Sequence, residues 1–165
     1  VKRLQLIADR FSKIGSLPEP VETDLKEALE HVIDYMDRRT SNKVKMIRDF
    51  PDDDIQVKIN ASLFEWVIEN LSKNAVDAMG GEGTITLKVF EENRKAVVEV
   101  TDTGKGIRSK DIRNVFRPGF TTKKRGWGLG LSLAKRIVEE YHKGRIFVKW
   151  SEVGVGTTFR IELKK

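Results

Sequence analysis

The chain has 165 residues, of which 39% are hydrophobic and 34% charged, with a formal net charge of +6. These values predict one soluble domain with its own core. The absence of cysteine excludes disulfides, thiolate metal sites and cysteine nucleophiles. No apolar run approaches the roughly 20 residues of a membrane span. The charged start, 1-VKRLQLIADRF-11, lacks the pattern of a signal peptide, and without a first methionine we expect a piece of a longer protein.

Helical spacing of apolar residues predicts a first helix over 3–14, which Gly15 ends before a linker at 16–20. A second helix should begin after Asp24, which forms a capping box with Glu27, and run to about Arg39. Two short strands, 43–49 and 55–59, follow it. The second helix should bury one stripe of apolar side chains: Leu25, Ala28, Leu29, Val32, Ile33 and Met36.

The rest of the chain alternates one more pair of helices with four strands. Asn60 should cap a helix over 61–79, and 84–90 and 96–102 should form a hairpin. A long stretch of weak regular structure follows, with one short helix capped by Ser109. A helix over 129–142, stopped by Gly144, precedes strands at 145–150 and 157–164. This order predicts an α+β fold with a mostly antiparallel sheet covered on one face by helices.

The helix 61–79 carries a polar stripe beside its apolar face. Asn70, Asn74 and Asp77 lie at spacings of four and three residues and share the edge of the apolar arc. Oxygen ligands in such a row suit Mg²⁺ together with phosphates and water. A solvated polar edge explains the stripe at least as well when it is taken alone. Glu65, Glu69, Ser72 and Lys73 are expected on the side opposite that arc.

Two glycine clusters suggest close approach of a ligand to the backbone. In 102-DTGKGI-107, Asp102 ends a strand and could accept a hydrogen bond from an exocyclic amine such as that of adenine. An ordinary turn is the alternative. In 126-GWGLGLS-132, the amides at a helix start could bind an anion, with a hinge as the alternative. The neighbouring 121-TTKKR-125 supplies hydroxyls and cations for phosphate oxygens.

The positive charge is concentrated in one segment. From Lys105 to Arg125 there are eight basic residues and one acidic residue, Asp111, a net charge of +7 for that segment. So local a concentration suits a small polyanion better than a nucleic-acid duplex. A non-catalytic module that binds nucleic acid remains an alternative, and it predicts steep salt dependence without preference for adenine nucleotides.

Four motifs in order resemble the ATP-binding domain of sensor histidine kinases. They are 69-ENLSKNAVDAM-79, 102-DTGKGI-107, 116-FRPGFTTK-123 and 126-GWGLGL-131, within a likeness that runs from about Val21 to Leu163. This family belongs to the Bergerat-fold superfamily of kinases, chaperones, gyrases and mismatch-repair ATPases. The resemblance implies a two-layer α/β sandwich with a long ATP lid. It also implies Mg-ATP as ligand and transfer of the γ-phosphoryl to a histidine on a separate domain.

The resemblance also implies a role for individual residues. Asn70 and Asn74 would hold Mg²⁺ and, with Lys123 of the lid, serve the transfer. Asp102 would read the adenine amino group with support from Thr157. The implied nucleotide-binding residues are Asn74, Asp77, Asp102, Gly104, Gly106, Ile107, Phe120, Thr121, Thr122, Lys123, Gly126, Gly128, Leu129, Gly130, Leu131 and Thr157.

The resemblance divides the chain and implies its partners. Residues 1–15 would end the second helix of the dimerisation and phosphoacceptor domain, 16–21 would be a linker, and 22–165 the catalytic domain. Neither His31 nor His142 lies in a phosphoacceptor motif, so the phosphorylated histidine is expected outside this chain. The implied partners are that phosphoacceptor domain, a response-regulator receiver domain, a sensor domain and a second copy in a homodimer. Nucleic acid is not expected as a partner, and the implied location is cytoplasmic.

Several departures and alternatives accompany this resemblance. Gly119 replaces a common aromatic in the lid, Trp127 a small residue, and Asp77 a basic residue that would contact phosphate. An ATPase of the chaperone or mismatch-repair kind would need a glutamate base where this chain has Asn70. A protein-serine kinase of the same superfamily is a further alternative, although the N-terminal helix favours the histidine kinase.

Overall fold

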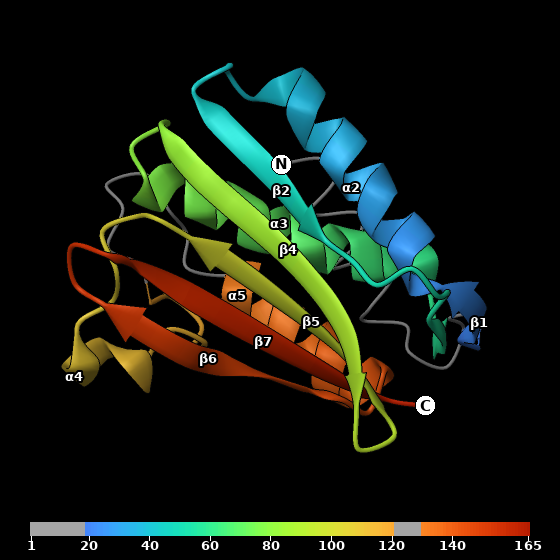
Figure 1. Cartoon of the computed structure of the whole chain (residues 1–165). Coiled ribbons are helices and arrows are strands. Elements are labelled where there is room, and N and C mark those ends of the chain that lie inside the picture. Colours follow the sequence, from blue (N-terminus) through green and yellow to red (C-terminus); the bar gives the residue numbers. More distant parts are fainter. Residues whose placement is uncertain (1–18, 121–129) are drawn as a thin grey trace.

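The computed structural model describes residues 19–120 and 130–165. A five-stranded sheet, in the order β2-β4-β5-β7-β6, forms one layer, and helices α2, α3 and α5 cover one of its faces (Figure 1). This arrangement confirms the predicted α+β fold with helices on one face of a mostly antiparallel sheet. The helix expected over 3–14 and most of the linker lie outside the described residues.

The sheet is antiparallel except at one edge. Strand β2 (Val44–Asp49) pairs in parallel with β4 (Gly83–Glu92). The β4–β5 hairpin, with β5 at Lys95–Asp102, is followed across the sheet by β7 (Gly156–Lys164) and the edge strand β6 (Arg145–Glu152). A separate antiparallel pair joins β1 (Val21–Asp24) to β3 (Gln56–Ile59). Strand β1 was not predicted, because its residues read as linker and helix cap.

Helix α2 (Leu25–Arg39) follows its prediction closely. The Asp24 side chain caps it by accepting a hydrogen bond of 3.0 Å from the backbone N–H of Lys26. All six side chains of the expected apolar stripe are buried. The local pattern was sufficient here because this helix packs through one face only.

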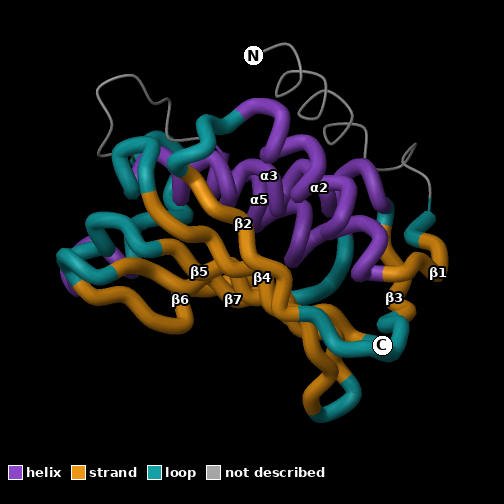
Figure 2. The backbone as a smooth tube through the Cα atoms, turned by 45° about the horizontal axis from the view of Figure 1, so that its top comes forward, coloured by secondary structure: helices purple, strands orange, loops and turns teal. Residues whose placement is uncertain are grey.

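Helix α3 (Ala61–Ala78) is more deeply enclosed than its sequence suggested. The Asn60 side chain caps it through Leu63 N–H at 3.1 Å, as expected. Glu69 and Ser72, which lie opposite the predicted apolar arc, are nevertheless only 4% and 0% exposed. The reason is tertiary: α3 contacts α2, α5 and strands β4 and β5, so that elements surround most of its circumference (Figure 2).

The two last helical segments differ in detail from their predictions. Helix α4 (Ser109–Ile112) has Arg108 at its N-cap, so the expected capping by Ser109 was wrong, because Ser109 is already the first helical residue. Helix α5 (Gly130–Arg136) continues into a π-helical turn, η2 (Ile137–Tyr141). Gly144 ends this segment, as predicted, and donates its N–H to Val138 O at 2.9 Å.

Ion pairs cover the sheet face opposite the helices. Arg160 of β7 donates to Glu92 of β4 at 2.5 Å, to Glu99 of β5 at 3.1 Å and to Glu162 at 2.9 Å. Lys149 of β6 adds a second cation to Glu99 at 2.9 Å. Only 13% of the Arg160 side chain is exposed, so these charges form a half-buried layer that joins four strands.

Candidate active site

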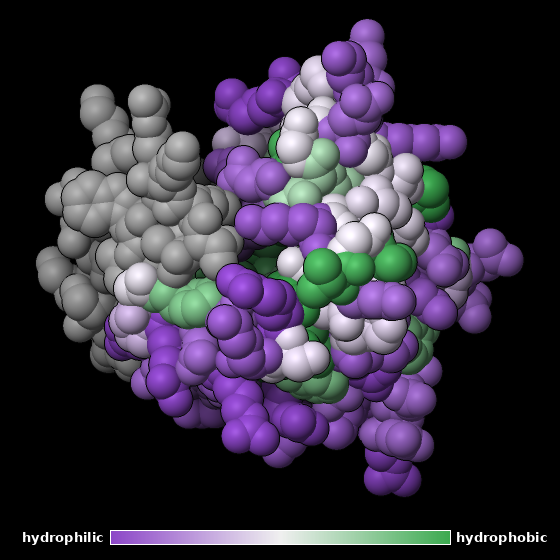
Figure 3. Space-filling view, turned by 90° about the vertical axis from the view of Figure 1, so that its left-hand side faces the viewer, coloured by the Kyte–Doolittle hydropathy of each residue, from purple (hydrophilic) through white to green (hydrophobic). Residues whose placement is uncertain are grey.

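The motif segments converge at one end of the sheet. The carboxyl ends of α3, β5 and β6 meet there with the amino ends of α5 and β7 (the left side of Figure 1). Figure 3 views this end, where the described surface is mostly hydrophilic with a small group of hydrophobic side chains near its middle. The fold therefore brings the first two motifs and the start of α5 into one neighbourhood, as the resemblance required.

Asp102 is the buried acid of this neighbourhood. It is 6% exposed, and its Oδ1 accepts a hydrogen bond of 2.8 Å from Gly104 N–H. Burial raises the pKa of Asp102, while hydrogen bonds from the backbone N–H groups of Gly104 and Thr157 oppose that rise. The β5–β7 register places Thr157, 3% exposed, directly opposite on the same face. Asp102 and Thr157 are thus two neighbouring polar residues with little access to solvent, which suits recognition of a polar ligand group.

The loop that follows Asp102 is fixed between α3 and the β6–β7 turn. Lys105 N–H donates to Ala78 O at 2.9 Å, and Lys105 O accepts from Gly154 N–H at 2.9 Å. A Cβ on Gly104 would lie 2.7 Å from the Ala78 carbonyl, so this position must be glycine for the loop to approach α3. Gly106 has φ 76°, a conformation that also favours glycine. These two glycines form a wall beside the acid.

The asparagine stripe of α3 faces the start of α5. A Cβ on Gly130 would lie 2.6 Å from Asn70 Oδ1, so the side chain of Asn70 packs directly against that glycine. Asn70 Nδ2 is buried and has no hydrogen-bond partner among the described residues. Asn74 is half-buried and Asp77 is exposed. Asn70 thus lies at the contact between α3 and α5, and Asn74 and Asp77 follow it toward the carboxyl end of α3.

The third motif is only partly described. Phe116 packs edge-on against Phe159 of β7, with ring centroids 5.9 Å apart, and so attaches this segment to the core. Gly119 has φ 84°, which a glycine adopts without strain, and Phe120 and Leu131 are half-buried. The remaining expected lid and glycine-box residues lie outside the described part of the chain: Thr121, Thr122, Lys123, Gly126, Trp127, Gly128 and Leu129.

Comparison with known proteins decides the family. Residues 60–165 match the family described as histidine kinase-, DNA gyrase B- and HSP90-like ATPases. This match covers the asparagine stripe, both glycine motifs and Thr157. The chain belongs to this ATPase family.

Relatives and solved structures of this family agree with the motifs. The chain is 31% identical, over 94% of its length, to the sensor histidine kinase ZraS of Escherichia coli and covers 35% of that protein. It is 30% identical, over 99% of its length, to sporulation kinase E of Bacillus subtilis and covers 22% of it. The catalytic domain of histidine kinase ThkA superposes with a TM-score of 0.81 at 28% identity, covering 90% of this chain and 97% of that domain. The chain thus spans about a third or less of these two curated relatives, and its likeness to histidine-kinase ATP-binding domains is confirmed.

Membership in this ATPase family implies ATP binding, and the described residues fit it. Asp102 offers a buried acceptor for a base, Gly104 and Gly106 shape the loop beside it, and the buried amide of Asn70 lies where α5 begins. No cluster of three or more histidine, aspartate or glutamate side chains that could hold a metal occurs in residues 19–120 and 130–165. A cation here would therefore depend on amide oxygens, phosphates and water, which is the environment that Mg²⁺ accepts.

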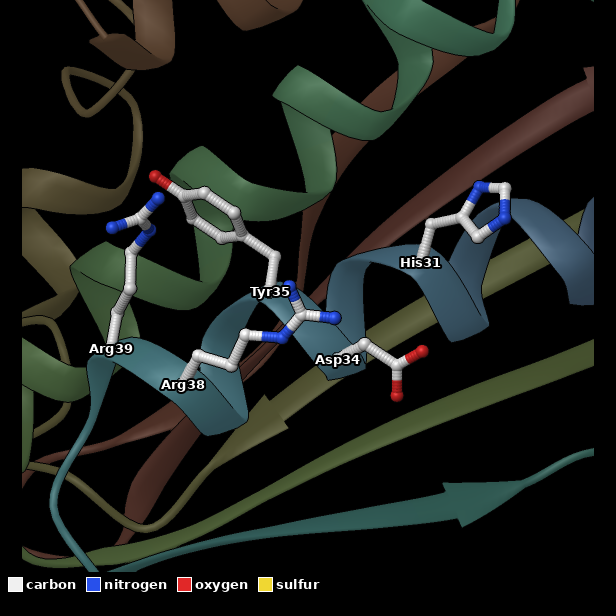
Figure 4. A pocket seen from close by; sticks show the side chains of 5 residues that line it. All are labelled: His31, Asp34, Tyr35, Arg38 and Arg39. Carbon is white, nitrogen blue, oxygen red and sulfur yellow. The ribbon is translucent and has the colours of Figure 1, made fainter.

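A shallow pocket elsewhere contributes nothing to this site. Its described lining comes from α2 alone and consists of His31, Asp34, Tyr35, Arg38 and Arg39, of which Tyr35 is directed toward α3 (Figure 4). None of these residues belongs to a motif of the ATPase family.

No helix in the described ranges has the length and apolar character needed to cross a bilayer.

One residue of the site was not foreseen. Ser151, at the end of β6, hydrogen-bonds both the loop after Asp102 and the side chain of Thr157. It belongs to no motif, and a serine near a strand end carries no distinctive sequence signal. Its place became visible only when the β6–β7 register was known.

Proposed function

We propose that this chain binds Mg-ATP and transfers its γ-phosphoryl group to a histidine on a separate phosphoacceptor domain. Asp102 is the observation that carries the proposal. Asp102 is 6% exposed at the end of β5, and its hydrogen bonds from the N–H groups of Gly104 and Thr157 only partly offset the cost of burying a carboxylate. An exocyclic amine would give it the hydrogen-bond donor that such an acceptor needs.

The asparagines of α3 would serve the phosphate end. Asn70 packs against the start of α5, Asn74 lies one turn further along α3, and both would hold Mg²⁺ through their amide oxygens. The cation supplies charge neutralisation for the phosphates when it is bound. Lys123, Thr121 and Thr122 are expected to contact phosphate oxygens from the lid, and Asp77 to lie near them.

The transfer itself needs little covalent chemistry from this chain. A histidine nitrogen forms a bond to the γ-phosphorus while the bond to the β–γ bridging oxygen breaks and ADP leaves. The residues of this chain hold the nucleotide in place and orient it, which is the main contribution of protein to phosphoryl transfer. Asn70 occupies the place of the glutamate base, and Glu69 beside it is 4% exposed, so activation of water is disfavoured.

The partners follow from the same reading. We expect a phosphoacceptor domain that continues from the helix 3–14, a homodimer formed through that domain, a sensor domain and a receiver domain. Support comes from the structure titled as histidine kinase ThkA in complex with the response regulator TrrA, whose fold this chain shares at a TM-score of 0.78 and 24% identity.

Calorimetric titration tests the binding half of the proposal. ATP is titrated with and without Mg²⁺, with GTP as the control nucleotide. We expect saturable binding that prefers adenine and is strengthened by Mg²⁺. No binding by the folded chain, or binding that falls steeply with salt and ignores the base, would overturn it in favour of a degenerate relative or a nucleic-acid module.

A second measurement separates kinase from ATPase. The chain is mixed with labelled ATP and a separately prepared phosphoacceptor domain from a histidine kinase, with its phosphorylatable histidine replaced by glutamine as the control. Acid-labile label on the intact acceptor alone supports histidine phosphorylation, whereas rapid phosphate release without it supports an ATPase.

Asn74→Ala should remove the Mg²⁺ dependence of ATP binding, and persistence of that dependence would show that Asn74 is not a ligand.

A further inference from the structure

Ser151 makes three short hydrogen-bond contacts at the edge of the candidate site. Its Oγ lies 2.8 Å from Ile107 N, 3.1 Å from Gly156 O and 2.8 Å from Thr157 Oγ1. Ser151 is half-buried, and Thr157 is 3% exposed. A single hydroxyl therefore joins the loop after Asp102, the first residue of β7 and the threonine opposite Asp102.

The number of available hydrogens fixes the direction of these bonds. A serine hydroxyl has one proton to donate and two lone pairs to accept with. Ile107 N–H can only donate, and Gly156 O can only accept, so the Ser151 proton goes to Gly156 and one lone pair receives Ile107 N–H. All three contacts are satisfied only if the remaining lone pair receives the proton of Thr157. Thr157 has then used its proton and presents only lone pairs to its other neighbours.

This arrangement sets the character of the base site. Thr157 lies opposite Asp102 in the β5–β7 register, on the same face of the sheet. An ionised carboxylate is also acceptor-only. The Thr157 hydroxyl and the Asp102 carboxylate would together offer two acceptors to the two hydrogens of an exocyclic amine, whereas a carbonyl oxygen at the same place would meet only lone pairs.

We propose that Ser151 is a specificity-determining residue, which holds the Thr157 hydroxyl as an acceptor so that the site takes a 6-aminopurine and rejects a 6-oxopurine. This inference rests on the proposed ATP binding. Ser151 need not touch the nucleotide; it acts through Thr157. Its bond to Ile107 also supports the loop wall, so affinity alone would not separate specificity from general support.

The ratio of two affinities tests the proposal. Dissociation constants are measured by calorimetry for Mg-ATP and for Mg-inosine triphosphate, which carries a 6-oxo group without the 2-amino group of guanine. Ser151→Ala frees the Thr157 proton, which can then rotate toward a carbonyl. We expect the preference for ATP to fall roughly five- to tenfold in this variant, the size of one reoriented hydrogen bond.

Two further variants serve as controls. Ser151→Thr keeps the hydroxyl and should keep the wild-type preference. Thr101→Val removes the Thr101–Thr158 hydroxyl contact of 2.9 Å on the outer face of the sheet and should change neither affinity. If Ser151→Ala weakens both nucleotides by the same factor, or changes neither, the specificity role is overturned and Ser151 is only structural.

A measurement on the wild-type chain does not depend on any variant folding. N6-methyl-ATP lacks one of the two amine hydrogens, so two acceptors predict a loss of roughly fivefold or more relative to ATP. Equal affinity for ATP and N6-methyl-ATP would overturn the two-acceptor site while leaving ATP binding intact. Failure of the wild-type chain to bind any of these nucleotides would overturn both this inference and the proposed function.

Discussion

Burial of the Asp102 carboxylate lowers the stability of the fold. Burial raises its pKa, and the N–H groups of Gly104 and Thr157 only partly compensate. An acid in this environment destabilises the fold in its charged form, which a purely structural residue would have no reason to do. The same desolvation strengthens any hydrogen bond that the carboxylate forms with a ligand amine.

Asp102→Asn should therefore separate binding from stability. We expect ATP affinity to fall at least roughly tenfold, because an amide N–H₂ meets the ligand amine in place of an acceptor. The melting temperature should stay the same or rise, since a buried charge is removed. Calorimetric titration and a thermal melt measure the two quantities; unchanged affinity at a matched melting temperature would remove Asp102 from base recognition.

His142 is a structural histidine. Its Nε2 accepts a hydrogen bond of 3.1 Å from Asn60 N–H, so its Nδ1 carries the proton and donates to Ile137 O at 2.9 Å. The ring also packs edge-on against Phe64 and Tyr141. Burial lowers the pKa of His142 from 6.5 to about 4, and the bond to Ile137 opposes this shift in part. The neutral ring thus ties the start of α3 to the π-helical turn.

The stability of the protein should depend on pH through this histidine. Since the folded pKa of about 4 lies below the unfolded 6.5, its contribution is complete above pH 6.5 and is lost as the pH falls toward 4. The shift corresponds to about 3 kcal/mol of unfolding free energy. Urea unfolding at several pH values should show the difference between wild type and His142→Gln shrinking over this window.

In helix α3, the residue that caps the helix and the residues proposed to bind a ligand lie in different halves. Asn60 caps its amino end through a hydrogen bond of 3.1 Å from Leu63 N–H, while Asn70 and Asn74 lie in the second half of the helix. The amino end contacts the π-helical turn through His142 and Tyr141. The helix can therefore be weakened at one end without altering the groups that would hold a ligand.

Asn60→Ala should lower the unfolding free energy by about 1–2 kcal/mol, through loss of the cap. ATP affinity should remain within roughly twofold of wild type at a temperature where both are folded. Asp24→Ala, which removes the equivalent cap of α2, is the matched control and should behave similarly. A large loss of ATP affinity in Asn60→Ala alone would mean that the two ends of α3 are coupled.

The five-stranded sheet is covered on one face by helices and carries a network of ion pairs on the other. Arg160 reaches carboxylates on three strands, and β6 joins through Lys149. Because Arg160, Glu99 and Glu162 are only 13%, 6% and 11% exposed, removal of Arg160 leaves poorly solvated carboxylates without compensation, and this cost exceeds that of breaking an exposed pair.

Arg160→Met should destabilise the protein by about 2–4 kcal/mol, measured by urea unfolding at neutral pH. Arg48→Met is the control, since its pair with Glu30 is 42% and 40% exposed and should contribute at most about 1 kcal/mol. Equal effects of the two substitutions would mean that the outer network is solvated in solution.

Several local features of this protein could be predicted from its sequence. The apolar stripe of α2, the caps at Asp24 and Asn60, the stop at Gly144 and the order of the strands were all legible, because each depends on residues close in the chain. The four ordered motifs were also sufficient to identify the family.

Contacts between residues far apart in the chain became known only from the fold. It buried Glu69 and Ser72, because helices and strands surround α3, and it placed Asn70 against Gly130. It also brought Ser151 to Thr157 across the β6–β7 pair. Periodicity along one segment reports a single buried face, whereas these contacts depend on strand register and on how neighbouring elements pack.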